Sequence, residues 1–75
     1  MDELKQVIAA TFQIPIDSIP DDGSNETVEN WDSLGQINLI MALEKQFKVS
    51  FTLEEILEMR DIPTIRRLIA EKKSA

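Results

Sequence analysis

Apolar residues recur at intervals of three and four positions in several parts of the chain, and this period predicts amphipathic α-helices. A first helix is expected over residues 2–12, where Leu4, Val7 and Ile8 share one face. A second, longer helix is expected over about residues 34–47. With two later segments, these patterns predict an all-α fold, a four-helix bundle with a long first loop and a short third helix.

The two later helices are marked by their start signals. Thr52 precedes Glu55 by three residues, which is the spacing of a capping box, and it opens the short third helix. The residues of that helix expected to face inward are Leu53, Ile56 and Leu57. Pro63 begins the last helix. Its inner face is expected to consist of Ile65, Leu68 and Ile69.

The long first loop covers residues 13–32, which show no helical period and contain Pro15, Pro20 and Gly23. A connection of this length needs something to hold it against a small domain. Its apolar side chains are expected to lie over the bundle: Ile14, Ile16, Ile19 and Val28.

The second helix carries more apolar residues than one face can bury. At 100° per residue, its core stripe is formed by Leu39, Ile40, Leu43 and Phe47. A separate stripe beginning next to Ser33 is formed by Leu34, Ile37 and Met41. Two interpretations are open, because this second stripe either packs beneath the loop or the next helix, or is an exposed docking surface.

Composition narrows the possible functions. The 75 residues suffice for one domain, residues 1–75, and the net charge of −6 argues against nucleic-acid binding. No segment is long and apolar enough to insert into a membrane, and the charged N-terminus is unlike a secretory signal. The chain lacks cysteine, and it lacks histidine, the usual general base. We expect a cytoplasmic monomer without catalytic residues or a metal site.

Ser33 stands at the start of the second helix. Its hydroxyl can accept a hydrogen bond from the backbone N–H of Gln36, three residues further along, and so cap the helix. An anion attached to Ser33 would face the unpaired N–H groups and the positive dipole end of the helix. Gly35 lowers helix propensity by up to ~1 kcal/mol relative to alanine and is expected to loosen this turn.

Asp32-Ser33-Leu34 is followed by a pattern of apolar residues with one glutamate: Ile37, Leu39, Ile40, Met41-Ala42-Leu43-Glu44 and Phe47. The whole segment resembles the signature of acyl carrier proteins and their peptidyl and aminoacyl relatives. The resemblance, which extends over essentially the whole chain, implies that 4′-phosphopantetheine is attached to Ser33 and holds acyl groups as thioesters. It also implies that Asp32 helps to bind the metal and coenzyme A during attachment.

The resemblance further implies a function and partners. The chain would be an acyl carrier protein for fatty-acid, polyketide or related biosynthesis, with aminoacyl or peptidyl cargo as the alternative. Its partners would be a phosphopantetheinyl transferase and the enzymes that load, elongate and transfer the acyl group. Docking of partners is expected at Leu34, Ile37, Met41 and Glu44. The residues expected to line the acyl chain are Ile40, Leu43, Ile56 and Ile65.

Other interpretations compete with this one. The segment around Ser33 half resembles a hydrolase nucleophile elbow, but Trp31 replaces the first glycine and no histidine is present. Residues 18–29 partly match an EF-hand loop, yet Ser18 and Pro20 stand where carboxylates are required. A helical adaptor that uses Ser33 only as a cap is a further alternative. The simplest interpretation of the acidic residues in the loop is solvated charge, with weak binding of a divalent cation as the alternative: Asp21, Asp22, Glu26 and Glu29.

The sequence departs from the fatty-acid type of carrier in its charge. Such carriers have a strongly acidic second helix, whereas Glu44 is the only acidic residue expected in this one, and Lys45 follows it. We therefore expect partner recognition to depend more on the stripe of Leu34, Ile37 and Met41 than on charge.

Overall fold

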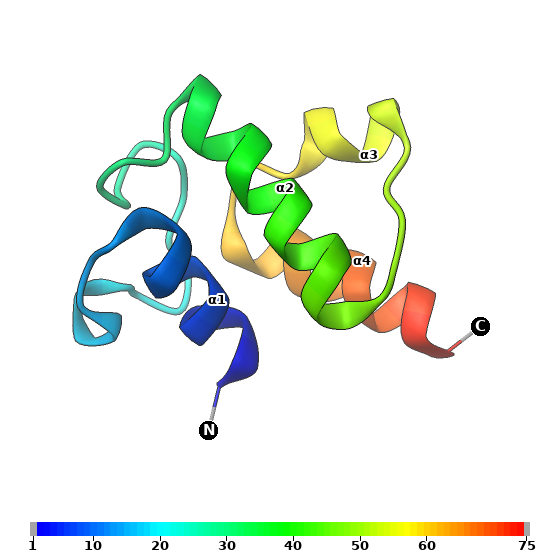
Figure 1. Ribbon diagram of the computed structural model, residues 1–75, viewed down its shortest axis with the longest axis horizontal. Coiled ribbons are helices and arrows are strands. Elements are labelled where there is room, and N and C mark those ends of the chain that lie inside the picture. The colour runs from blue at the N-terminus through cyan, green and yellow to red at the C-terminus, as the bar shows by residue number, and fades with distance from the viewer. Residues whose placement is uncertain (1, 75) are drawn as a thin grey trace.

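The computed structural model describes residues 2–74, and these form an all-helical structure (Figure 1). The elements in chain order are α1 (Glu3–Phe12), the short 3₁₀ helix η1 (Ile16–Ser18), α2 (Ser33–Phe47), α3 (Leu53–Glu58) and α4 (Ile62–Ser74). In Figure 1, α2 crosses the middle of the molecule, with α1 on one side and α3 and α4 on the other. The predicted bundle, with its long first loop and short third helix, is confirmed.

The helices begin and end where side chains or the backbone satisfy their free groups. The Thr52 hydroxyl accepts from the Glu55 N–H at 3.1 Å and the Glu55 carboxylate accepts from the Thr52 N–H at 2.8 Å, which is the predicted capping box. The Asp61 carboxylate accepts from the Thr64 N–H at 2.8 Å and starts α4. At its other end, α2 stops because Lys48 takes a left-handed conformation with φ of 56°.

The core lies where the four helices and the loop meet. Its buried hydrophobic residues are Leu4, Ile8, Phe12, Ile19, Val28, Trp31, Leu39, Ile40, Leu43, Phe51, Met59, Ile62, Ile65, Leu68 and Ile69. The predicted core stripe of α2 is buried except for Phe47, which is half-buried. No helix within residues 2–74 combines the length and the apolarity needed to cross a membrane.

The long loop is held to the connection between α3 and α4. Ser24 and Asp61 form an isolated antiparallel bridge. Beside it, the Asn25 N–H donates to the Arg60 carbonyl at 2.9 Å, and the Ile62 N–H donates to the Gly23 carbonyl at 2.8 Å. The expected apolar anchors Ile19 and Val28 are buried and Ile14 is partly buried, but Ile16 is exposed because it lies in η1, on the surface.

The expectation that three residues of α3 face inward was wrong for two of them. Leu53 and Leu57 are 71% and 61% exposed, and Ile56 alone is packed against the core. A helix of six residues turns only one narrow face inward, and the fully buried Met59, which follows the helix, fills the adjoining core position.

Candidate functional site

Ser33 is the first helical residue of α2, and the cap is Asp32, which corrects the expectation that Ser33 caps the helix. The Asp32 carboxylate accepts from the Gly35 N–H at 2.8 Å. The Asp32 backbone is extended, as a cap requires, whereas Ser33 is already helical. The Ser33 side chain is exposed and makes no hydrogen bond to the described part of the chain. Its hydroxyl is therefore available for reaction.

Gln36 does not close a capping box with Ser33 either. Its side-chain carbonyl accepts from the Trp31 indole N–H at 2.6 Å. Its amide group donates to the carbonyls of Met59 and Ile56, at 2.9 and 3.2 Å. Gln36 thus joins the buried Trp31, two residues before Ser33, to the end of α3, and this bridge fixes the position of the serine relative to α3.

Gly35 has a packing role that helix propensity does not predict, because the loop lies directly against the first turn of α2 at this residue. A Cβ atom at this position would lie 2.3 Å from the Asn30 carbonyl oxygen and 3.1 Å from the Phe12 ring. The loop can come so close because Asn30 takes a left-handed φ of 69°, and its side-chain amide donates to the Phe12 carbonyl at 2.9 Å. The absence of a side chain at Gly35 therefore allows the loop to pack against the start of α2.

Ser33 lies at the edge of a cleft of about 430 Å³, which we call the serine cleft. Its lining residues come from the loop, α2, α3 and the α3–α4 connection: Asn25, Trp31, Asp32, Ser33, Gln36, Leu57 and Arg60. The lining includes an apolar residue, hydrogen-bonding groups and one cation, and its volume is within the usual range for small-molecule sites. An exposed hydroxyl beside such a cleft fits a group that is attached through a phosphate and extends as a flexible chain.

The predicted docking stripe of α2 is exposed along its whole length. Leu34, Ile37 and Met41 are 68%, 58% and 57% exposed, so they do not pack beneath the loop. Leu53 and Leu57 of α3 are exposed as well. Sequence reasoning missed their exposure, although their spacing of four residues in a helix already placed both on one face.

Glu44, the fourth residue expected to dock partners, has a structural contact. It is half-buried, and its carboxylate accepts from the Phe51 N–H at 2.9 Å. This bond holds the segment between α2 and α3 against α2. Glu44 thus has a role within the fold, whether or not it also meets partners.

The four residues expected to line an acyl chain belong to the packed interior. Leu43 and Ile65 are fully buried, Ile40 is buried, and Ile56 is half-buried against them. None of these four residues lines the serine cleft. An acyl chain would enter among them only if α2 moved relative to its neighbours.

The acidic residues of the loop do not gather into a site. Asp21 pairs with Lys5 of α1, and this hydrogen-bonded pairing holds the pKa of the Asp21 carboxyl below its usual value. Within residues 2–74, no three acidic side chains lie close enough together to hold a metal ion.

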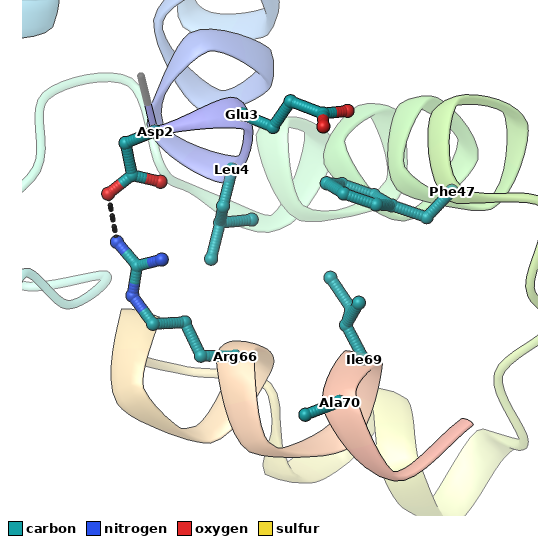
Figure 2. A pocket seen from close by; sticks show the side chains of 7 residues that line it. All are labelled: Asp2, Glu3, Leu4, Phe47, Arg66, Ile69 and Ala70. Atoms are coloured by element: carbon teal, nitrogen blue, oxygen red, sulfur yellow. Dashed lines mark hydrogen bonds and ion pairs between the residues drawn. The ribbon is translucent and has the colours of Figure 1, made fainter. Parts of the chain in front are cut away.

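A second cleft, the distal cleft, lies at the other end of α2 and has a volume of about 590 Å³. Figure 2 shows Leu4, Phe47 and Ile69 pointing into it from three different helices. Asp2 and Arg66 form an ion pair across one side. Because α2 has 15 residues and rises ~1.5 Å per residue, this cleft is separated from Ser33 by about 20 Å along the helix.

Comparison with known families agrees with this geometry. Residues 2–71 match the family described as the phosphopantetheine attachment site. The chain therefore belongs to this family of carrier proteins. It is a non-catalytic carrier, and its prosthetic group is 4′-phosphopantetheine, bound covalently to a serine. Carriers of this family are modified by a phosphopantetheinyl transferase and serve biosynthetic enzymes.

Proposed function

We propose that Ser33 is the serine that carries 4′-phosphopantetheine. The observation that supports this assignment is the exposed Ser33 hydroxyl, which no described residue engages and which borders the serine cleft. Asp32 caps the helix in place of Ser33, so that modification would cost no capping bond. When bound, the prosthetic group supplies a terminal thiol on which acyl groups are held as thioesters.

We further propose that the cargo is an acyl group of fatty-acid, polyketide or related biosynthesis, carried by residues 1–75 as a single domain. The support is the apolar layer that α2, α3 and α4 form from Ile40, Leu43, Ile56 and Ile65, which an acyl chain would reach by displacing α2 from its neighbours. Burial of an alkyl chain in such a layer is favourable by roughly 0.8 kcal/mol per CH₂ group, and an aminoacyl group would gain little from it. A long acyl cargo should therefore raise the melting temperature of the carrier, whereas equal stability with acetyl and long-chain cargo would favour aminoacyl carriage.

The attachment site is tested by intact mass. The purified chain is incubated with coenzyme A, magnesium and a broad-specificity phosphopantetheinyl transferase, alongside Ser33→Ala and a matched control, Ser24→Ala. The native chain and the control should each gain one phosphopantetheine, and Ser33→Ala none. If Ser33→Ala gains the same mass while folded, another serine is the site. If no variant gains mass, Ser33 has no carrier role and the adaptor interpretation takes its place.

We propose that partner enzymes dock on the apolar surface formed by Leu34, Ile37, Met41, Leu53 and Leu57. Exposed apolar area of this kind on α2 and α3 supports the proposal, because partner contacts are commonly built on such patches. In addition, α2 offers little negative charge, since Glu44 is its only acidic residue.

The docking surface is tested with Met41→Asp, which places a charge in the middle of the α2 stripe. We expect kcat/KM of the transferase for the carrier to fall at least about tenfold, while the melting temperature changes little because Met41 is exposed. Gln46→Asp adds the same charge at another exposed position of α2 and should retain most activity. If salt abolishes the native reaction and Met41→Asp has no effect, recognition depends on charge and the proposal is wrong.

A further inference from the structure

A phosphate on Ser33 would share the start of α2 with a carboxylate that is already there. The Asp32 carboxylate already occupies the start of α2, where it accepts from the Gly35 N–H. A phosphodiester on Ser33 would place a second negative charge on the adjacent residue. Two like charges a few ångströms apart repel each other, and a nearby cation offsets this repulsion by attracting both.

Arg60 is the cation among the residues that line the serine cleft. Its guanidinium forms no ion pair within residues 2–74. The two other arginines of the chain are paired, Arg66 with Asp2 and Arg67 with Glu71. Arg60 is therefore distinguished by its place in the cleft and by its unneutralised charge.

The backbone of Arg60 is held firmly although its side chain is exposed. Its N–H donates to the Glu58 carbonyl at 2.8 Å, and its carbonyl accepts from the Asn25 N–H at 2.9 Å. Gln36, the other long polar side chain of the cleft, has both ends engaged by Trp31, Ile56 and Met59. Arg60 is thus the long side chain of the cleft that is free to bind an added group.

We infer that Arg60 is a positioning residue that pairs with the phosphodiester of the prosthetic group and draws its attached end into the serine cleft. This inference rests on the proposed attachment at Ser33. Arginine suits the role because its planar guanidinium donates two parallel hydrogen bonds to phosphate oxygens. Leu57, in the same lining, offers apolar contact to the alkyl part of the group.

The test compares the unmodified and modified carrier by NMR of the arginine side chains, with the added mass confirmed on each sample. Only three arginines occur in the sequence, so their Nε–H signals are assigned by single substitutions. On modification, the Arg60 signal should shift, while those of Arg66 and Arg67 should not. The shift should shrink between about 20 mM and about 0.5 M NaCl, because salt screens an exposed ion pair.

The phosphorus signal of the modified carrier gives a second readout. In Arg60→Gln, the ³¹P resonance should move and lose its dependence on salt, whereas Arg60→Lys should retain part of that dependence. Arg67→Gln is the matched control and should leave the ³¹P spectrum unchanged. An exposed pair of this kind changes the population of the bound arrangement by up to about fivefold.

Three outcomes would overturn the inference, and they differ from one another. If the carrier gains the mass but Arg60 gives the same signal before and after modification, Arg60 does not meet the phosphate. If Arg60→Gln slows modification yet leaves the ³¹P spectrum of the product unchanged, Arg60 serves the transferase instead. If Ser33 takes up no group at all, the proposed attachment and the role of Arg60 fall together.

Discussion

The two ends of α2 each border a cleft, and they differ in size and in chemistry. The distal cleft is larger, at about 590 Å³, and its walls include Leu4, Phe47 and Ile69. The serine cleft is smaller, at about 430 Å³, and includes Ser33 and Arg60. Volume alone would point to the distal cleft as the functional site. The smaller cleft has the exposed hydroxyl of Ser33, which we propose carries the prosthetic group, and Arg60, which is unpaired within residues 2–74. We therefore place the candidate site there from the chemistry of the lining and not from its size.

The two ends also differ in what holds them together. Around Ser33, directional hydrogen bonds each involve at least one buried or half-buried residue: Asp32 with Gly35, Asn30 with Phe12, and Gln36 with Trp31 and Met59. At the distal end, the Asp2–Arg66 ion pair is partly exposed to solvent. Changes near Ser33 should therefore cost more stability than changes at the distal end.

The largest effect is expected for Gln36→Met, which keeps the length of the side chain and removes its polar atoms. The Trp31 indole N–H and the Met59 carbonyl would lose their partners. Since an unsatisfied buried group costs about 1–3 kcal/mol, the free energy of unfolding should fall by about 2–3 kcal/mol. Urea unfolding followed by circular dichroism measures this change.

Gln46→Met is the matched control, because Gln46 lies near the distal end of α2 and makes only a 3.5 Å contact with Glu3. Its free energy of unfolding should stay within about 0.5 kcal/mol of the native value. Equal losses for Gln36→Met and Gln46→Met would show that the hydrogen bonds around Ser33 contribute no more to stability than the contact at the distal end.

Gly35→Ala is expected to lower the stability by a smaller amount, although helix propensity predicts that alanine would raise it. Propensity alone favours alanine by ~1 kcal/mol, but the new methyl group would collide with the Asn30 carbonyl. Overpacking of this kind costs about 1–3 kcal/mol, so the melting temperature should fall. Asn38→Ala, at an exposed position of the same helix, should leave it unchanged or slightly raised. A more stable Gly35→Ala variant would mean that the loop does not pack closely against α2.

Much of the fold was predictable from the sequence because the period of its apolar residues is strong. The spacing of Leu39 and Leu43 gave α2 its core stripe, and the pair Thr52 and Glu55 gave the start of α3. The exposure of Leu53 and Leu57 was not predictable from hydrophobicity alone. A short helix has too few residues to define its inner face, and Met59, just beyond its end, took the core position instead.

The sequence predicts which residue is the centre of the candidate site, but it does not predict which side chains surround that residue. The motif located Ser33, yet serine and aspartate both serve as caps, and only the backbone conformation shows that Asp32 has this role. The bridge from Gln36 to Met59 spans 23 positions, and a local pattern contains no information about it. Likewise, Arg60 meets the serine cleft only because the loop and the α3–α4 connection are hydrogen-bonded to each other.

The smallest effect is expected at the distal end, for Arg66→Gln. The hydrogen bond from Arg66 lowers the pKa of Asp2, so the pair stabilises the fold while Asp2 is ionised. A lowered carboxyl pKa gives stability that is present at neutral pH and is lost as the pH falls through that pKa. Because the pair is about one-third exposed, Arg66→Gln should lose only ~0.2–1 kcal/mol at neutral pH.

A double-mutant cycle of Arg66→Gln with Asp2→Asn isolates the coupling energy of the Asp2–Arg66 ion pair. Asparagine suits this cycle because its side-chain oxygen can still accept the capping hydrogen bond from the Lys5 N–H. The coupling should disappear in acid, once Asp2 is protonated; a coupling that persists there would not come from the ion pair. Arg66→Gln should be modified at Ser33 as fast as the native chain, because the pair lies at the opposite end of α2. Slower modification would mean that the two ends of α2 are coupled through the helix and do not act independently.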